Sequence, residues 1–569
     1  MAHQTRSVRR VAARRSLAAL AAVVTFGLLT ACTPGGEPTS PGASGSASTT
    51  STTTTSAAKT LTVGASLEPQ TLDPTKLAYV AAAQVELFNV YETLVKIDGD
   101  GRLQPLLAQR WELSPDRLTY TFFLNPAAKF ASGKQVTADA VVKNIDRLRT
   151  ATADAVNSKY STWMKVVSGA TAVDPTTVKV VLSRPSNTWL YAMGDTTGII
   201  ADPDGFADLA TKSAGSGPYQ VKEWRKGDSI VLERNPGYWG TQPRFDTVTF
   251  KYFTDPNAMN TAMLAGTLDI ISNEQAPDAL AQFADPAAFT VLDGGTNGEV
   301  TLALNNSSAA LKNVKVRQAI AMAIDKKKIL DDVEAGHGVV LGTMDVPTDP
   351  YYEDLSAVNS YDPEKAKALL KEAGVASLTL RLRPLAVPYA TAAATDVAAM
   401  LKAVGINVTV SVEQPGTWID SVFLKADYDL SIVSHAEARD LNTYTNPQYY
   451  WRYTSAAFNA AWLAADSASP EEYPEAMKKA ARILADCAKG LEAAGADMVL
   501  ICTNTMHKVA DETAAAVSVP DHRSDRQRAS TSPTLTPCPA SGCMAWAASP
   551  TASTRRPTGA GGGSTNGWA

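Results

Sequence analysis

The sequence predicts an α/β fold of two or more lobes. Segments with the alternating hydrophobicity of strands are interspersed along the body of the chain with segments of helical period, and no short repeat separates them. The chain has 569 residues, enough for several domains, with 45% hydrophobic residues, an ordinary value for a globular protein. Its net charge is -5 without a long run of like charge, so there is no electrostatic basis for binding nucleic acid.

Cysteine placement separates the ends of the chain from its body. The five cysteines are Cys32, Cys487, Cys502, Cys538 and Cys543. None lies between residues 33 and 486, so the body has no internal disulfide and no thiolate metal site. Four of the five lie in the last part of the chain, which marks a change of composition there.

Residues 1–31 have the pattern of a signal peptide. Five arginines precede an apolar run from Leu17 to Leu29, which is short for a bilayer span. The run ends in Leu29-Thr30-Ala31-Cys32, which resembles a bacterial lipobox. This resemblance implies cleavage before Cys32 and a lipid on its thiol; an uncleaved anchor helix or a chance match is the alternative. Arg14-Arg15 also resembles part of a twin-arginine signal, so export by the Sec or the twin-arginine route stays open.

Residues 32–59 are almost wholly Thr, Ser, Gly, Pro and Ala. Such a segment cannot bury a core, and it predicts a flexible tether. A lipid at Cys32 followed by this tether would hold the folded part outside the cell, close to the membrane.

Residues 60–486 carry the predicted folded body. Pro363 at the first turn and Gly374 at the end delimit one helix, and Lys226-Gly227-Asp228 forms the turn of a hairpin. The predicted elements are a strand in LTVGASLEP, short strands over 89–130, a helix opened by Thr137-Ala138-Asp139, the hairpin within 215–239, a helix in 311–330, the helix in 361–374, and strands in LTLRLRPL and INVTVSVE.

Several of these segments carry a family resemblance. They are Leu72-Asp73-Pro74, Tyr91-Glu92-Thr93-Leu94, Asp98–Trp111, Gly215–Trp239, and Val316-Arg317-Gln318-Ala319-Ile320 followed by Ala323-Ile324-Asp325. In this order they resemble the family 5 extracellular solute-binding proteins of ABC importers, the peptide and nickel group. The resemblance covers about residues 60–486. It implies a two-lobe periplasmic-binding-protein-like fold with a ligand cleft that closes on a peptide-like or other small ligand.

The resemblance also implies ligand-facing residues. Peptide binders of this group often place an acid in the stretch that corresponds to DLSIVSHAEARDLNTYTNPQYYW, where it pairs with the amino group of the ligand. Glu437 and Asp440 are the candidates, although the usual tryptophan-containing pattern is absent; a solvated loop is the alternative. Thr296 and Asn297 resemble the cleft-edge stretch of the family, and a plain turn is their alternative.

Three further residues complete the candidates. Trp418 forms either an apolar wall for the ligand or part of the core. His337 and His435 would be ligands if the cargo were nickel, but two lone histidines without a cluster are a weak case for a metal. We therefore predict no resident metal, no cofactor and no catalytic residue.

The family resemblance ends near Asp486. The last helix of the body places Met477, Ala480, Ala481 and Leu484 on one face. In the family a segment after this helix returns to complete the first lobe, and this closing segment is missing here. Residues 487–520 instead predict alternating helices and strands, with Met498–Cys502 as a strand of a parallel sheet.

The stretch from Cys502 to His507 resembles the second catalytic motif of the Asp/Glu racemase family. A thiol at a strand end, just before a helix, would be shifted toward its thiolate. That chemistry uses two thiols on opposite faces of the substrate, and the only cysteine before Cys487 is Cys32. The fragment 487–520 therefore does not predict an enzyme.

Residues 521–569 predict a disordered, low-complexity tail, in which Cys538 and Cys543 do not form a zinc pattern. Taken together, the sequence predicts a monomeric, lipid-anchored, extracytoplasmic solute-binding protein that delivers peptides or similar small solutes to an ABC transporter permease. The alternatives are a racemase-like activity of the C-terminal fragment and a truncated, nonfunctional fusion. Dipeptides, oligopeptides, nickel complexes and opine-like solutes all remain open as cargo.

Overall fold

The computed structural model describes residues 5–10, 59–76, 80–99, 101–150, 158–437, 439–486 and 498–500. Within them, buried apolar side chains form separate cores. The C-terminal core is built from residues between Val300 and Ala481, and the N-terminal cores from residues between Leu61 and Phe283. The two parts of the chain thus bury their apolar surfaces separately, as lobes do.

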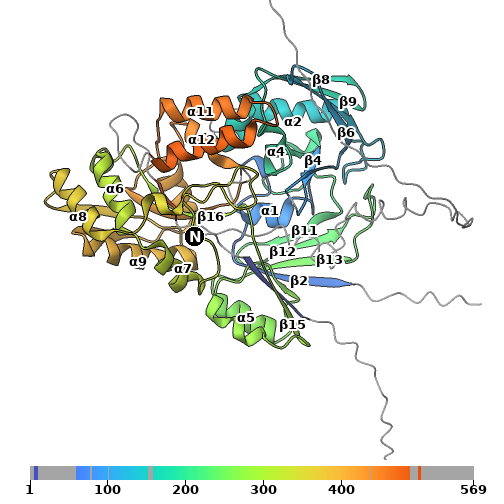
Figure 1. Cartoon of the computed structure of the whole chain (residues 1–569). Coiled ribbons are helices and arrows are strands. Elements are labelled where there is room, and N and C mark those ends of the chain that lie inside the picture. Colours follow the sequence, from blue (N-terminus) through green and yellow to red (C-terminus); the bar gives the residue numbers. More distant parts are fainter. Residues whose placement is uncertain are drawn as a thin grey trace, which may run out of the picture. The chain divides into compact units, whose positions relative to one another are not determined.

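The largest sheet belongs mainly to the N-terminal part and has the strand order β11-β12-β13-β2-β14-β1-β15 (Figure 1). Its strands are β1 (Thr5–Arg10), β2 (Thr60–Ala65), β11 (Tyr219–Arg225), β12 (Ser229–Arg234), β13 (Thr247–Tyr252), β14 (Ile270–Ile271) and β15 (Phe289–Gly294). β2 runs parallel to β13 and β14, whereas β1 is antiparallel to both of its neighbours. The predicted hairpin is confirmed as β11 and β12, with Gly227 in the left-handed region at its turn.

A second, antiparallel sheet of the N-terminal part has the order β6-β7-β9-β8. Its strands are β6 (Ala108–Leu113), β7 (Thr119–Leu124), β8 (Val167–Asp174) and β9 (Thr177–Leu182). In β7, Tyr120, Phe122 and Leu124 are buried and alternate with half-buried residues, as expected for a strand with one face on a core. The predicted helix α2 (Ala138–Thr150) is confirmed and packs on this sheet.

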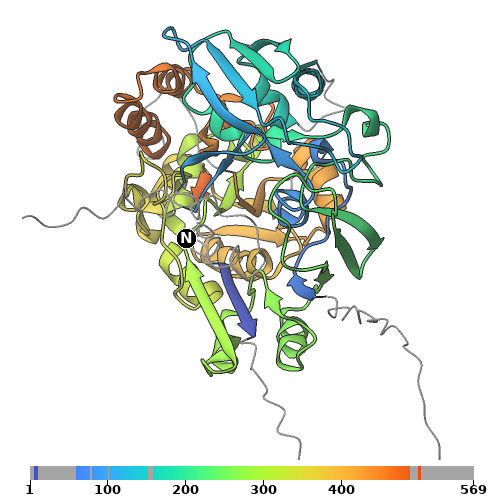
Figure 2. The same ribbon diagram turned by 90° about the vertical axis from the view of Figure 1, so that its right-hand side faces the viewer.

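Smaller elements complete the N-terminal part. They are α1 (Val80–Glu86), β3 (Glu92–Thr93), β4 (Val95–Ile97), β5 (Leu103–Pro105), α3 (Ser158–Met164), α4 (Trp189–Ala192), β10 (Ile199–Ile200) and α5 (Pro256–Leu264). β3 pairs with β10 and β4 with β5. Figure 2 shows the chain turned by 90° about the vertical axis from the view of Figure 1.

The sheet of the C-terminal part has the order β18-β17-β19-β16-β20. Its strands are β16 (Glu299–Leu304), β17 (Leu378–Leu382), β18 (Ile406–Val410), β19 (Leu430–His435) and β20 (Met498–Leu500). β17 is parallel to β18 and β19, and β16 is antiparallel to β19 and β20. All six residues of β16 are buried.

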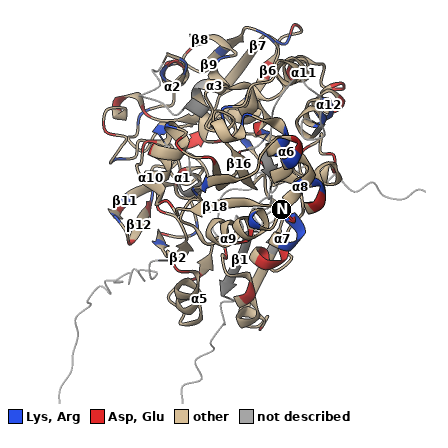
Figure 3. Ribbon diagram, turned by 90° about the vertical axis from the view of Figure 1, so that its left-hand side faces the viewer, with Lys and Arg blue, Asp and Glu red and all other residues tan. Residues whose placement is uncertain are grey.

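The helices of this part are α6 (Val314–Ala323), α7 (Lys326–Glu334), α8 (Pro363–Glu372), α9 (Pro388–Ala403), α10 (Pro415–Thr417), α11 (Ala456–Ser467) and α12 (Tyr473–Asp486), with a π-helix over Trp418–Leu424. The predicted end signals of α8 are confirmed: Pro363 lies in its first turn and Gly374 has a φ of 71°. In addition, the Asp362 side chain caps the helix by accepting a hydrogen bond from the Lys365 N–H. Lysines and acids intermix on α7 (Figure 3), where Lys327 pairs with Asp331.

The predicted face of α12 is confirmed, because Met477, Ala480 and Ala481 are buried in the C-terminal core. The predicted strand at Met498 is present as β20, but it is antiparallel to β16, so the prediction of a parallel sheet is wrong there. The basic N-terminal residues contribute β1, which sequence periodicity did not indicate. Cys32, most of the tether, Cys487, Cys502, and the tail with Cys538 and Cys543 lie outside the described residues.

Across the described part of the chain, every helix is too short or too polar to cross a lipid bilayer.

Candidate functional site

The candidate site lies at the carboxyl end of β19. This strand lies between β17 and β16, and five of its six residues are buried, so its position is fixed on both edges. Its last residue, His435, lies opposite Glu299 of β16 and is 6% exposed. His435 Nε2 is 3.0 Å from the Tyr450 hydroxyl oxygen, a hydrogen bond that orients the imidazole ring.

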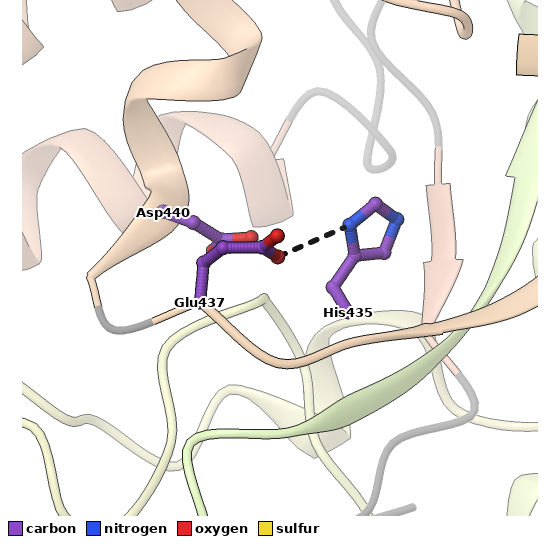
Figure 4. A group of neighbouring side chains, drawn as sticks. All are labelled: His435, Glu437 and Asp440. Atoms are coloured by element: carbon purple, nitrogen blue, oxygen red, sulfur yellow. Dashed lines mark ion pairs between the residues drawn. The ribbon is translucent and has the colours of Figure 1, made fainter. Parts of the chain in front are cut away.

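Two carboxylates approach His435, that of Glu437 from the loop after β19 and that of Asp440 from the start of the 3-10 helix Asp440–Thr445 (Figure 4). Glu437 Oε2 lies 3.9 Å from His435 Nδ1. One ligand-capable atom from each of His435, Glu437 and Asp440 lies within 4.8 Å of the others. Asp440 is only 3% exposed. Two carboxylates and an imidazole so close together offer several acceptor atoms to one point, so this group would stabilise a bound cation or ammonium group. The structure thus brings the two predicted acids together.

Arg439 holds this loop against both parts of the chain. Its φ of 60° is left-handed, so the chain turns sharply between the two acids. Its guanidinium carbon lies 3.3 Å from the centroid of the Tyr191 ring, a cation–π contact, and 5.8 Å from that of Tyr473. Tyr191 belongs to α4 in the N-terminal part, whereas Tyr473 belongs to α12. The sequence analysis missed Arg439, since no local pattern pairs it with a distant aromatic residue.

Aromatic side chains surround the imidazole of His435. The ring of Tyr450 stacks on it with centroids 5.9 Å apart, and those of Trp451 and Tyr449 lie 5.4 Å and 6.2 Å away. All three follow one another in the chain and are buried. Aromatic residues give a binding site rigid apolar surface beside its polar groups. Sequence reasoning named none of the three, although YYW closes the stretch that it singled out.

Trp418 lies in the C-terminal core. It is 3% exposed, and its indole Nε1 donates a hydrogen bond of 3.0 Å to Ser431 Oγ. Its ring centroid is 5.8 Å from that of Tyr450, so Trp418 supports the aromatic residues beside His435. This placement favours the core interpretation of Trp418 over that of an apolar wall.

Trp418→Phe separates these two interpretations. Loss of the indole N–H leaves Ser431 without one partner, so we expect the unfolding free energy to fall by about 1 kcal/mol. Solute affinity should change less than twofold. Urea denaturation and isothermal titration calorimetry measure the two quantities. A large loss of affinity with unchanged stability would instead make Trp418 a ligand contact.

Thr296 and Asn297 form the turn before β16, beside the end of β19. Thr296 Oγ1 accepts a hydrogen bond of 2.8 Å from the Gly298 N–H, and Asn297 Oδ1 accepts one of 3.4 Å from Thr348 Oγ1. A Cβ on Gly298 would lie 3.2 Å from the His435 carbonyl oxygen, which shows how closely the turn approaches the site. A role in contacting the ligand stays a prediction for both residues. His337 is absent from the group formed by His435 and the two acids.

Two aspartates lie in the loop after α7, Asp345, which is buried, and Asp349, which is half-buried. Burial raises the pKa of Asp345 to about 7 and that of Asp349 to about 6. The positive charge of Arg439 and a 3.1 Å hydrogen bond from the Val346 N–H act against the shift at Asp349. Arg439 therefore connects the candidate site electrostatically to this loop.

These raised pKa values predict a pH dependence of stability. Between about pH 4 and pH 7 the folded chain holds protons that the unfolded chain has released, so the unfolding free energy falls as pH rises through this window. Asp345→Asn cannot ionise. We therefore expect its unfolding free energy to fall less than that of the parent over this pH range, by a difference on the order of 3 kcal/mol. Urea denaturation across this pH range measures it, with the exposed Asp285→Asn as control. Parallel pH profiles of Asp345→Asn and the parent would contradict the prediction.

Comparison with known proteins identifies the family. Residues 102–460 match the sequence model of the bacterial extracellular solute-binding proteins, family 5, middle region, which is more than half of the chain. The chain belongs to this family. The matched residues include β19, the loop with Glu437 and Asp440, and the three aromatic residues, so the candidate site lies within the family 5 region.

Two curated proteins of Escherichia coli strain K12 are similar to this family 5 chain. The dipeptide-binding protein is 29% identical over 360 residues, which cover 58% of this chain and 67% of the relative. The nickel-binding periplasmic protein is 30% identical over 298 residues, covering 50% and 56%. The chain thus spans between half and two thirds of the length of these relatives.

Among solved structures, the murein tripeptide binding protein MppA of Escherichia coli matches with a TM-score of 0.70 at 21% identity, over 79% of this chain and 93% of that one. This match shows the fold: a mixed helix and sheet protein that matches two-lobe periplasmic binding proteins. The predicted fold class is confirmed. The predicted loss of the closing segment concerns residues after Asp486, where the structure describes only β20.

Proposed function

We propose that this chain is an extracytoplasmic, lipid-anchored solute-binding protein that delivers a peptide or similar small solute to an ABC importer. Family membership supports the general role, and the names of two similar proteins specify a dipeptide and a murein tripeptide as solutes. The signal pattern that ends at Cys32 supports export and lipid attachment. We expect a monomer that catalyses no reaction and works through affinity and lobe closure.

One observation carries the choice of a peptide-like solute. Glu437 and Asp440 lie together with His435 at the end of β19, where they form a partly buried acidic site. An ammonium group offers three N–H donors and a positive charge, and carboxylates are acceptors that match both. The adjoining aromatic rings would pack against the apolar part of the solute. Contact of Arg439 with Tyr191 would link occupancy of this loop to the position of the N-terminal part.

A metal complex is the second candidate solute. Imidazole and carboxylate donors within 4.8 Å of one another are a set that binds divalent transition metals. One similar protein is named as nickel-binding. In this case nickel would be the cargo of the chain and not a resident cofactor.

Native mass spectrometry of the full chain, purified after expression with its leader, tests the proposal. We expect a co-purified solute with the mass of a small peptide, and a thermal shift when di- and tripeptides are added after its removal. Nickel(II) added alone tests the second candidate. If neither peptides nor nickel(II) raised the melting temperature, and no solute co-purified, the proposal would fail. A mass without a diacylglycerol at Cys32 would refute the anchor.

The enzyme alternative has a separate test. The racemase-like fragment lies outside the described residues except for β20, so the setting of Cys502 is not part of the described structure. We expect no racemisation of aspartate or glutamate by the full chain. Turnover that disappears in Cys502→Ala would favour the enzyme. A chain without a cooperative melt would favour the nonfunctional fusion.

A further inference from the structure

β15 is joined to the seven-stranded sheet through β1 alone, among the strands that the structure describes. All six residues of β1 pair with β15, from Thr5 opposite Gly294 to Arg10 opposite Phe289. On its other edge β1 pairs with β14, where Val8 lies opposite Ile271 and Arg9 opposite Ile270. Figure 2 shows β1 as the dark blue arrow beside the green arrow of β15. The N-terminal segment thus fills a slot between two strands that do not pair with each other.

Backbone hydrogen bonds hold β1 in this slot between β14 and β15. An inserted strand offers N–H and C=O groups to both neighbours, and without it β14 and β15 would each present an unpaired edge. β15 would keep local anchors at its start: the Phe289 N–H donates a hydrogen bond of 2.9 Å to the Asp285 carbonyl oxygen, and the Phe289 and Phe283 ring centroids are 5.2 Å apart. β14 has only two residues and keeps its parallel partner β2. The segment Thr5–Arg10 therefore completes this end of the sheet.

We propose that residues Thr5–Arg10 are a temporary strand of the precursor, and that removal of the leader before Cys32 opens a strand-acceptor slot between β14 and β15. The inference rests on leader cleavage, which is part of the proposed function. The occupant is this chain's own leader, bound antiparallel to both neighbours. In the mature chain the slot takes the same extended segment when it is supplied as a separate peptide, by addition of a strand to an open sheet.

Hydrogen–deuterium exchange of the full chain tests the pairing without any cleavage. Val8→Pro removes a backbone N–H in the middle of β1 and restricts its φ, so we expect exchange in Phe289–Gly294 to become about tenfold faster or more. His3→Pro, outside β1, is the matched control and should leave this exchange unchanged. The seven-stranded sheet away from the slot, such as β12, should stay protected in both variants. Equal protection of β15 in the parent and Val8→Pro would overturn the proposal.

The mature form provides the second arm. A chain that begins at Cys32 should exchange β15 amides as fast as the Val8→Pro variant. A synthetic peptide of residues 3–12 should restore protection, whereas the same peptide with Val8→Pro should not. Restoration by both peptides, or by neither, would overturn the slot as a strand acceptor. Solute binding is not measured here, and mass analysis of Cys32 tests cleavage separately, so failure of this inference is distinguishable from failure of the proposed function.

Discussion

Asp466→Ala is expected to lower the unfolding free energy by about 3–5 kcal/mol, the usual cost of removing one partner from a buried charged network. Asp466 lies near the end of α11 and is 0% exposed. Its Oδ2 accepts a hydrogen bond of 2.6 Å from Arg184 Nη1, and its carboxylate accepts bonds of 2.9 Å and 3.0 Å from Ser186 Oγ. The N–H of Thr188 donates at 3.0 Å and its hydroxyl at 2.7 Å. Removal of the carboxylate would leave the buried donors of Ser186 and Thr188 without this acceptor, whereas the half-buried Arg184 keeps its hydrogen bond to the Pro185 carbonyl oxygen.

The Asp466 junction, which we define as Asp466 with residues 184–188, also joins the two parts of the chain. α11 packs into the C-terminal core through Phe458 and Trp462, whereas Trp189, directly after the 184–188 segment, belongs to an N-terminal core. Asn187 adds hydrogen bonds to the main-chain oxygens of residues 465, 466 and 468. Loss of this junction should therefore reduce the coupling between the parts as well as their stability.

Two controls make the result specific. Asp466→Asn keeps the shape and one acceptor oxygen, so it should lose less stability than Asp466→Ala. Asp420→Ala removes an exposed acid that pairs with Lys425, and should cost less than about 1 kcal/mol. Urea denaturation measures all three variants. A loss below about 1 kcal/mol for Asp466→Ala would mean that the junction contributes little to folding.

The sequence predicted the helices and strands of the body well because their signals are local. Pro363 in the first turn and Gly374 after the end delimit α8 without reference to any other part of the fold. The buried face of α12 follows from its spacing of apolar residues in the same way. These elements satisfy local and tertiary preferences at once.

Contacts between residues that are far apart in the chain leave weaker signals in the local sequence pattern. An acid near the C-terminal end of a helix is unfavourable with the helix dipole, so Asp466 departs from a local rule, and this departure was the available sign of its tertiary role. Arg439 gave no comparable sign, because its contact with Tyr191 depends on how the two parts meet. The pairing of β1 with β15 also depends on the open edge that β15 offers in the folded sheet, and the hydrophobic period of the N-terminal segment alone cannot predict it.

The second large effect is expected at the candidate site. Asp440→Asn keeps the size of the side chain but removes its charge, so we expect the dissociation constant for the co-purified peptide to rise about 10- to 100-fold. Glu437→Gln, at the more exposed acid, should have a smaller effect of the same sign. Isothermal titration calorimetry measures both affinities, and Asp420→Asn, an exposed change with the same loss of charge, is the control.

Acetylation of the amine of the peptide shows which interaction accounts for the loss of affinity in Asp440→Asn. If Asp440 binds an ammonium group, acetylation of the peptide amine should weaken binding to the parent chain about as much as Asp440→Asn does. Acetylation should weaken binding to Asp440→Asn little further, because acetylation and the substitution remove the same interaction. A double-mutant cycle would then show strong coupling between them. Additive losses would instead place the amine away from Asp440. In that case the acid would serve to position the loop that Arg439 holds against Tyr191, and the ligand contact would lie elsewhere in the chain.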